Sequence, residues 1–528
     1  MTLFVAVDDR KRGRSVAWPM LAAALAAIAA FWPALQAGIT PEDFGWLVAA
    51  RQLESPWPLL SGNVFFVYFY RPVPLLLWWL SAQAFGANAV LHNALDMAIH
   101  ALNAALVARL AWRISNRMEA AWVAGLIFAC LPCAVGTALW MSDRFDPLAL
   151  CFGLGALLAF ERALVSRFSS IALGILLLGA LLSKETAYAV AGWLLLRMAW
   201  RVWRRGTWRV DLWLAVLLPI GAALMLRVLS GTSVDTSLPI ADVPGAMLAG
   251  VVAWWWRFPQ ALSGFFHLSG KVTISTGALM LFVTMVAVVL VALKSLVAER
   301  KREAATLALC GAALIFATPW LQWPITRLAL ADVPGFDAPV NLRFYYLAAA
   351  GVALLLGACV AASRDAARLA SIGLIALLCI AGTIHSYFLS ALWTQDFSAN
   401  SERHLQLSRD LAARDWPDGC RIVLDAPSFN DDFRTHADII AKGAAARGAT
   451  LMHCAVFAGT QVYTTIVDGK FCAADAWPGL AISLTNDKPV IARLGNLCTL
   501  QFASPPAEND PRALHFAVAP DGHLIESH

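Results

Sequence analysis

Two adjacent carboxylates, Glu42 and Asp43, follow the first long apolar run of the chain, at about residues 16–37. In water just outside a membrane such a pair costs little, but unpaired burial there would cost several kcal/mol. In a water-accessible cavity Asp43 could take a proton as a general base. We assign that role to Asp43 over Glu42 because the second acid lies nearer the turn at residues 44–46, where a helix is expected to begin. The alternative is a solvated pair at a helix N-terminus, where acids interact favourably with the dipole.

More ionisable residues recur at the ends of apolar runs, on the side that we assign to the outer face. They are Arg71, Asp143, Arg144, Asp146, Lys184, Glu185 and Arg343, with Tyr345 close to the last. Any one of them could simply extend toward the membrane interface without a further role. Because both signs of charge recur on one side, the pattern predicts a single polar site at that face.

Acids and cations together at a membrane face suit the transfer of a sugar from a lipid-linked phosphate. Breaking the sugar–phosphate bond leaves negative charge on the phosphate, which Arg and Lys stabilise. The acceptor hydroxyl must lose its proton as it attacks, and a nearby carboxylate accepts it. On this chemistry Asp43 and Glu42 are candidate catalytic residues. The substrate-binding candidates are Arg71, Arg144, Asp146, Lys184, Glu185, Arg343 and Tyr345.

The elements that must position these residues are membrane helices. The chain has 528 residues, of which 59% are hydrophobic and only 14% charged, whereas a soluble protein carries about a quarter charged residues. Long apolar runs alternate with basic segments, which indicates an all-α polytopic protein with about eleven spans and a cytoplasmic N-terminus. The spans are expected near residues 16–37, 90–112, 120–139, 147–160, 168–182, 186–200, 212–229, 273–292, 305–321, 341–363 and 369–391.

Two segments need separate treatment. The basic residues at 10–14 precede a first apolar run that is longer than most signal-peptide cores, so we predict an uncleaved span. Residues 247–267 are apolar but interrupted by Arg257-Phe258-Pro259, and we predict an interfacial or re-entrant segment.

The composition changes near Gln395, which divides the chain into a transmembrane region, 1–394, and a C-terminal domain, 395–528. We expect a small soluble α/β or α+β domain, with helices near 402–416 and 437–447. Its strands are expected near residues 421–425, 450–457, 462–467 and 481–484. The alternation of basic loops places this domain in the periplasm.

Ten cysteines fall into two groups. Those in the transmembrane region, including the Cys130-x-x-Cys133 pair, lie in or beside apolar runs and are expected to be core residues. The C-terminal domain holds an even number, which fits two disulfides in an oxidising compartment. These four are Cys420, Cys454, Cys472 and Cys498, and the sequence leaves all three pairings open, with a zinc site as the alternative.

Several local patterns resemble the GT-C class of membrane glycosyltransferases, most of all the protein O-mannosyltransferase family and its tetratricopeptide-repeat relatives. The similar stretches are Glu42-Asp43, Tyr70-Arg71-Pro72, Phe85-Gly86, His100 with Asn103, Trp140 to Asp146, Leu182 to Glu185, and Arg343 to Leu347. The resemblance covers about the first 390 residues. It implies a polyprenyl-phosphate sugar donor and an inverting mechanism.

The chain also departs from that family. The C-terminal domain shows no tetratricopeptide repeats, so the acceptor is left open. His92 and Asn93 do not have the usual His-to-Asn spacing of the family, and we expect His92 and His100 to be structural. No cofactor is firmly implied, and a divalent metal stays open.

We therefore expect an inverting glycosyltransferase of the bacterial inner membrane that acts on an acceptor hydroxyl of a protein, a lipid or an envelope glycan. The alternatives are a transporter or lipid flippase with a periplasmic accessory domain, and an inactive scaffold of the same fold. A transporter would place its binding groups nearer the bilayer midplane, often in two related halves, and no internal repeat is visible. The chain lacks a basic tail suited to nucleic acid.

Overall fold

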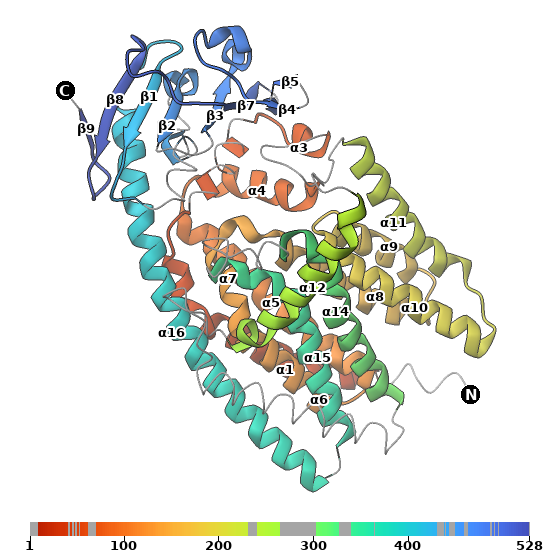
Figure 1. The fold of residues 1–528 in the computed structure, drawn as a ribbon. Helices are drawn as coiled ribbons and strands as arrows, with labels where there is room; N and C mark the ends of the chain where they lie inside the picture. The colour runs from red at the N-terminus through yellow and green to blue at the C-terminus, as the bar shows by residue number, and fades with distance from the viewer. Residues whose placement is uncertain are drawn as a thin grey trace.

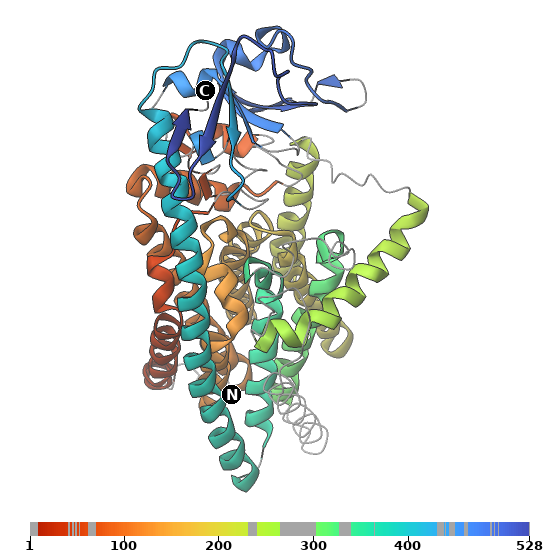
Figure 2. The same cartoon turned by 60° about the vertical axis from the view of Figure 1, so that its left-hand side comes forward.

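The structure is a computed structural model, shown in Figures 1 and 2. It describes residues 9–40, 43–44, 47, 50–51, 53–61, 70–230, 240–263, 302–326, 339–363, 365–429, 438, 440–442, 449–458, 463–485, 488–489, 491–494 and 496–526. Most of these residues are helical, and the β-strands gather at one end of the molecule.

The helices up to residue 230 are α1 (Asp9–Ala30), α3 (Trp57–Ser61), α4 (Pro72–Phe85), α5 (Ala89–Ser115), α6 (Met118–Cys130), α7 (Val135–Leu139), α8 (Phe145–Ala163), α9 (Ser169–Leu181), α10 (Tyr188–Arg205) and α11 (Val210–Leu229). Those that follow are α12 (Val243–Ser263), α14 (Arg302–Thr326), α15 (Tyr346–Ala362) and α16 (Asp365–Ala412). Short 3₁₀ turns join several of them, including Met141–Asp143, Glu185–Ala187 and Pro339–Tyr345.

Within the described residues, five helices are long and apolar enough to cross a membrane. They are Ala89–Ser115, Val210–Leu229, Arg302–Trp323, Leu342–Ala362 and Ile372–Ala412. A sixth span results if the pair Met118–Cys130 and Pro132–Leu139, bent by 52°, is taken as one crossing. The structure is thus a multi-pass helical protein, but the predicted count of about eleven spans is not confirmed.

The shortfall has identifiable causes. The predicted span near 168–182 forms the 13-residue helix α9, which is short for a bilayer crossing. Helix α8 carries Asp146, Glu161 and Arg162 within its length, and α10 ends in several arginines. The predicted span at 273–292 lies outside the described residues.

Helix α15 runs through the centre of the helical body and is buried along almost its whole length. It crosses α14 where Gly311 and Gly351 face each other, and a Cβ atom on either glycine would collide with the main-chain carbonyl of the other. Small residues at such a crossing let two membrane helices approach closely enough for extensive van der Waals contact. A third glycine, Gly357, packs in the same way against the Ala120 carbonyl of α6.

Helix α16 extends from one end of the helical body to the sheets at the other (Figure 2). The predicted boundary between residues 394 and 395 falls inside this continuous helix, which also contains most of the predicted separate helix at 402–416. The Ser401 hydroxyl of α16 accepts a hydrogen bond from the Ile39 N–H, at 2.9 Å. The helix therefore anchors the chain that follows α1 as well as the strands.

The C-terminal region has an α+β arrangement of small sheets. A four-stranded sheet has the order β2 (Ala455–Ala458), β1 (Arg421–Asp425), β8 (Ala513–Val518) and β9 (Leu524–Glu526), with β1 parallel to β2 and β8. An antiparallel sheet orders β3 (Tyr463–Asp468), β7 (Leu497–Phe502) and β6 (Ile491–Leu494), and β4 (Leu484–Thr485) pairs with β5 (Lys488–Pro489). The predicted strand at 421–425 coincides with β1.

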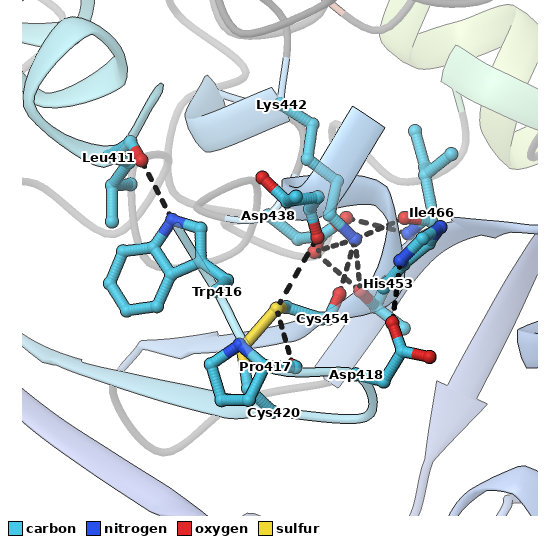
Figure 3. The surroundings of a disulfide bond; sticks show 12 residues. Leu411, Trp416, Pro417, Asp418, Cys420, Asp438, Lys442, His453, Cys454 and Ile466 are labelled. Atoms are coloured by element: carbon cyan, nitrogen blue, oxygen red, sulfur yellow. Dashed lines mark hydrogen bonds and ion pairs between the residues drawn. A yellow bond between two sulfur atoms is a disulfide. The ribbon is translucent and has the colours of Figure 1, made fainter. Parts of the chain in front are cut away.

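Disulfide bonds join Cys420 to Cys454 and Cys472 to Cys498, which selects one of the three open pairings. Beside the first, a fully buried lysine, Lys442, pairs with Asp438 at 2.9 Å and donates to the Cys454 carbonyl at 2.6 Å (Figure 3). Burial lowers the pKa of Lys442 and raises that of Asp438, because both charged forms lose hydration. The six remaining cysteines, all in the helical body, are free.

Candidate functional site

Asp43 begins a helical turn and is completely buried. Its Oδ2 atom accepts hydrogen bonds from the Thr40 N–H at 2.9 Å and from the Thr40 hydroxyl at 2.8 Å. Asp43 lies three residues after Thr40, and its carboxylate accepts the hydrogen bond from the Thr40 N–H. This bond is characteristic of a capping box. Asp43 therefore has a structural role at a helix N-terminus, and the expected water-accessible cavity does not reach it in the described structure.

The other carboxylate oxygen of Asp43 connects it to a second segment. Ser142 donates a hydrogen bond to Asp43 Oδ1 at 2.5 Å, and the Trp140 indole N–H donates to the Thr40 hydroxyl at 3.0 Å. Two segments that are about 100 residues apart in the sequence are thus joined side chain to side chain. The turn Met141–Asp143 between α7 and α8 holds Ser142 in this position.

The same turn continues into a buried group of two acids and two cations. Lys184 forms an ion pair with Asp146, and Arg343 lies 3.8 Å from Asp143. The guanidinium of Arg343 also stacks 3.8 Å from the Trp140 ring. Burial raises the pKa of Asp143 well above its ordinary value and Asp146 raises it further, against the opposing effect of Lys184 and Arg343.

Arg71, at the start of α4, joins this group through Glu185. Its guanidinium donates to both Glu185 oxygens, at 2.6 Å for the shortest contact, and lies 5.0 Å over the Phe145 ring. Arg227 of α11 makes a second ion pair with Glu185 at 2.9 Å. Burial alone would raise the pKa of Glu185, but the two arginines lower it to about 2.

Arg144 lies in a neighbouring buried cluster and not among the acids of its own turn. It pairs with Asp96 of α5 at 2.7 Å, donates to the Ser81 hydroxyl at 2.7 Å and contacts His92 Nδ1 at 3.0 Å. Its guanidinium also lies 4.4 Å over the Trp78 ring. Arg144 is 1% exposed, so this cation joins α4, α5 and α8 and does not face a solvent-accessible surface.

The members of the charged cluster differ in their exposure. We use this name for Asp43, Arg71, Asp143, Asp146, Lys184, Glu185 and Arg343. The side chains of Arg343 and Glu185 are 19% and 27% exposed, whereas those of Lys184 and Asp146 are 4% and 2% exposed. A ligand that approached from solvent would therefore meet Arg343 and Glu185 before Lys184 and Asp146.

Tyr345, like Arg144, falls outside the cluster. The Tyr345 ring packs against Trp254 and Phe258 of α12, with ring centroids 5.0 Å and 6.1 Å apart. Glu42 lies outside the described residues. His100, expected to be structural, bonds to the Tyr346 hydroxyl at 2.8 Å, and His92 contacts the Gly86 carbonyl at 2.9 Å.

Sequence reasoning missed Asp96, Ser142 and Arg227. Asp96 was hidden inside a predicted apolar span, although its spacing from His92 by four residues puts both on one helix face, where they meet Arg144. Ser142 has no distinctive local pattern, and Arg227 lies at the end of an apolar run where nothing in the sequence links it to Glu185. Among the described residues, no group of three or more His, Cys, Asp or Glu side chains is arranged to hold a metal ion.

The fold that carries this cluster is similar to that of an oligosaccharyltransferase of known structure. The chain is similar to the oligosaccharyltransferase of Archaeoglobus fulgidus in its apo form, with a TM-score of 0.50 and 15% identity over 82% of this chain. It spans 64% of the length of that protein. Because the identity is low, this similarity establishes the fold alone.

Two further similarities are weaker. The ArnT structure from Cupriavidus metallidurans with bound undecaprenyl phosphate gives a TM-score of 0.47 and 14% identity, over 92% of this chain and 98% of that one. AglB from Archaeoglobus fulgidus, in complex with an inhibitory peptide and a dolichol-phosphate, gives a TM-score of 0.49 and 15% identity. This match covers 82% of this chain and 64% of AglB. No protein-family model matches the chain, and no curated protein matches it.

Proposed function

We propose that this protein is an inverting glycosyltransferase that moves a sugar from a polyprenyl-phosphate donor to an acceptor hydroxyl at the outer face of the inner membrane. The observation that carries the proposal is the convergence of the charged cluster, in which acids and cations from segments far apart in the sequence lie in mutual contact. The fold shared with a membrane oligosaccharyltransferase supports the same reaction class.

The cations supply the electrostatic part of this reaction. Arg343 is the most exposed cation of the cluster, whereas Arg71 and Lys184 are more deeply buried. A phosphate placed beside Arg343 would receive bidentate hydrogen bonds from the guanidinium, which stabilise the charge that develops as the sugar–phosphate bond breaks. In this proposal Arg144 is a positioning residue, because Asp96, Ser81 and His92 already bind its guanidinium.

In this proposal Asp43 is the general base. Because Asp43 is buried and the Ser142 hydroxyl donates to its Oδ1 atom at 2.5 Å, an acceptor hydroxyl would have to replace Ser142 as the donor to this carboxylate. Attack on the anomeric carbon from the face opposite the phosphate would invert its configuration. The proposal includes the resemblance to the protein O-mannosyltransferases, and it takes the acceptor to be a hydroxyl of a protein, a lipid or an envelope glycan.

The test is to incubate the purified protein with polyprenyl-phosphate sugars and an envelope extract, and to follow the release of polyprenyl phosphate and the movement of labelled sugar. The proposal expects turnover of at least one donor, with inverted configuration in the product. The protein reconstituted in vesicles serves as the comparison. If it moved the intact lipid or a solute across the bilayer and left every donor uncleaved, the protein would be a transporter.

A further inference from the structure

A second charged region lies near the C-terminal ends of α5 and α8. Helices α5 and α8 both run from the cluster end, where they carry Asp96 and Asp146, to an end that carries arginines. There, Arg109, Arg113 and Arg162 line a half-open cavity of about 570 Å³ between α5, α8 and α9. We call it the arginine groove.

Apart from these cations and Ser169, the walls of the arginine groove are apolar. Leu106, Leu158 and Leu176 form the walls, and none of the described residues that line the groove is acidic. The nearby Glu161 carboxylate binds Arg197 of α10 at 3.2 Å, while its main-chain carbonyl accepts a bond from Arg113 at 3.3 Å. The groove therefore combines several positive charges with a hydrocarbon-like surface.

We propose that the arginine groove binds an anionic phospholipid, with its phosphate among the arginines and an acyl chain along the leucines. Basic pockets between membrane helices match such lipids because the phosphate gains charge-assisted hydrogen bonds while the chain stays in an apolar environment. A free phosphate would gain the charge-assisted hydrogen bonds but not the apolar contacts of an acyl chain. The proposal does not depend on the proposed glycosyltransferase activity, since the groove is remote from the charged cluster.

The experiment uses the full-length protein, delipidated in detergent, and native mass spectrometry with phosphatidylglycerol and phosphatidylethanolamine of identical acyl chains. Phosphatidylglycerol should bind more tightly. The double variant Arg109→Gln/Arg162→Gln should weaken its binding by about tenfold, and Arg113 is kept because it bonds to the Glu161 carbonyl. The control Arg167→Gln removes an exposed arginine just beyond α8 that does not line the groove.

Equal binding of the two lipids, an unchanged affinity in the double variant, or the same loss in the Arg167 control would each overturn the proposal. The single variant Arg162→Gln, at an exposed position, replaces the double variant if that protein does not fold, and should weaken binding by about threefold. Polyprenyl phosphate is titrated in parallel. If it displaced phosphatidylglycerol with the same dependence on the arginines, the groove would belong to the sugar donor and not to a phospholipid.

Discussion

Asp43 combines two roles that are usually separate. It closes a capping box with Thr40, and it meets Ser142 from the turn before α8. A capping residue is held in one rotamer by its hydrogen bonds, which is also what a general base needs in order to act on one proton. The hydrogen bonds thus hold the Asp43 carboxylate in position. Kinetic measurements distinguish its structural role from its proposed catalytic role.

Arg144 gives a prediction about stability. Arg144→Ala would leave Asp96 buried without its cation, which should destabilise the protein by about 3–5 kcal/mol and lower its abundance. Thermal unfolding in detergent measures this, with Arg167→Ala, at an exposed position just beyond α8, as the control. If Arg144→Ala instead folded normally and bound the sugar donor poorly, Arg144 would contact the phosphate directly.

Glu185 gives a prediction about pH. Its pKa is lowered to about 2 in the folded protein from an ordinary value of 4.5, so its ionised form stabilises the fold. This contribution is fully present above about pH 4.5 and is lost as the pH falls toward 2. The stability difference between wild type and Glu185→Gln should therefore shrink over that range. A constant difference would contradict the pairing, and Glu54→Gln, at an exposed position, is the control.

Among the elements, sequence patterns located helices better than they located the ends of spans. Long apolar runs predicted the segments of α5 and α15, and the run Ile422-Val423-Leu424 predicted β1. The long helix α16 was predicted as two because the change of composition near Gln395 was taken for a boundary. No proline interrupts residues 365–412, so the backbone continues as one helix while its surroundings change.

The crossing of α14 and α15 gives a prediction at this scale. Gly351→Leu should force the two helices apart, because even a Cβ there meets the Gly311 carbonyl. We expect a loss of about 1–3 kcal/mol or more, as for other overpacked sites, measured by thermal unfolding in detergent. Gly373→Leu is the matched control, because a Cβ at Gly373 meets no heavy atom within 4 Å. Equal stability of the two variants would refute the close approach.

In the whole molecule, the gathering of charges was the most informative signal in the sequence. Placing Arg71, Asp146, Lys184 and Arg343 on one side predicted that they would meet, and the structure brings them together. The detailed partners could not be predicted. The pairing of Arg144 with Asp96, for example, depends on how α4, α5 and α8 pack, and local spacing does not contain that information.

The C-terminal region gives a prediction about compartment. Cys420, Cys454, Cys472 and Cys498 should resist thiol labelling of the intact, non-reduced protein, because all four are in disulfides. Reduction should destabilise the region by roughly 2–4 kcal/mol for each bridge.

A periplasm-dependent reporter fused after Trp393 should be active and one fused after Arg205 inactive. Labelled cysteines or the reverse reporter pattern would place the region in the cytoplasm.

The most direct test of the proposed function is the transfer rate of Asp43→Asn, measured per folded, donor-binding molecule of purified protein. The substitution keeps the size of the side chain and one carbonyl oxygen for the bonds from Thr40 or Ser142, but removes the basic group. We predict near-normal donor binding and a transfer rate lower by a factor of about 10² to 10⁴. Ser142→Ala, which removes a contact of Asp43 and leaves its carboxylate, should cost less. A full transfer rate in the folded Asp43→Asn protein would contradict the assignment of Asp43 as the base.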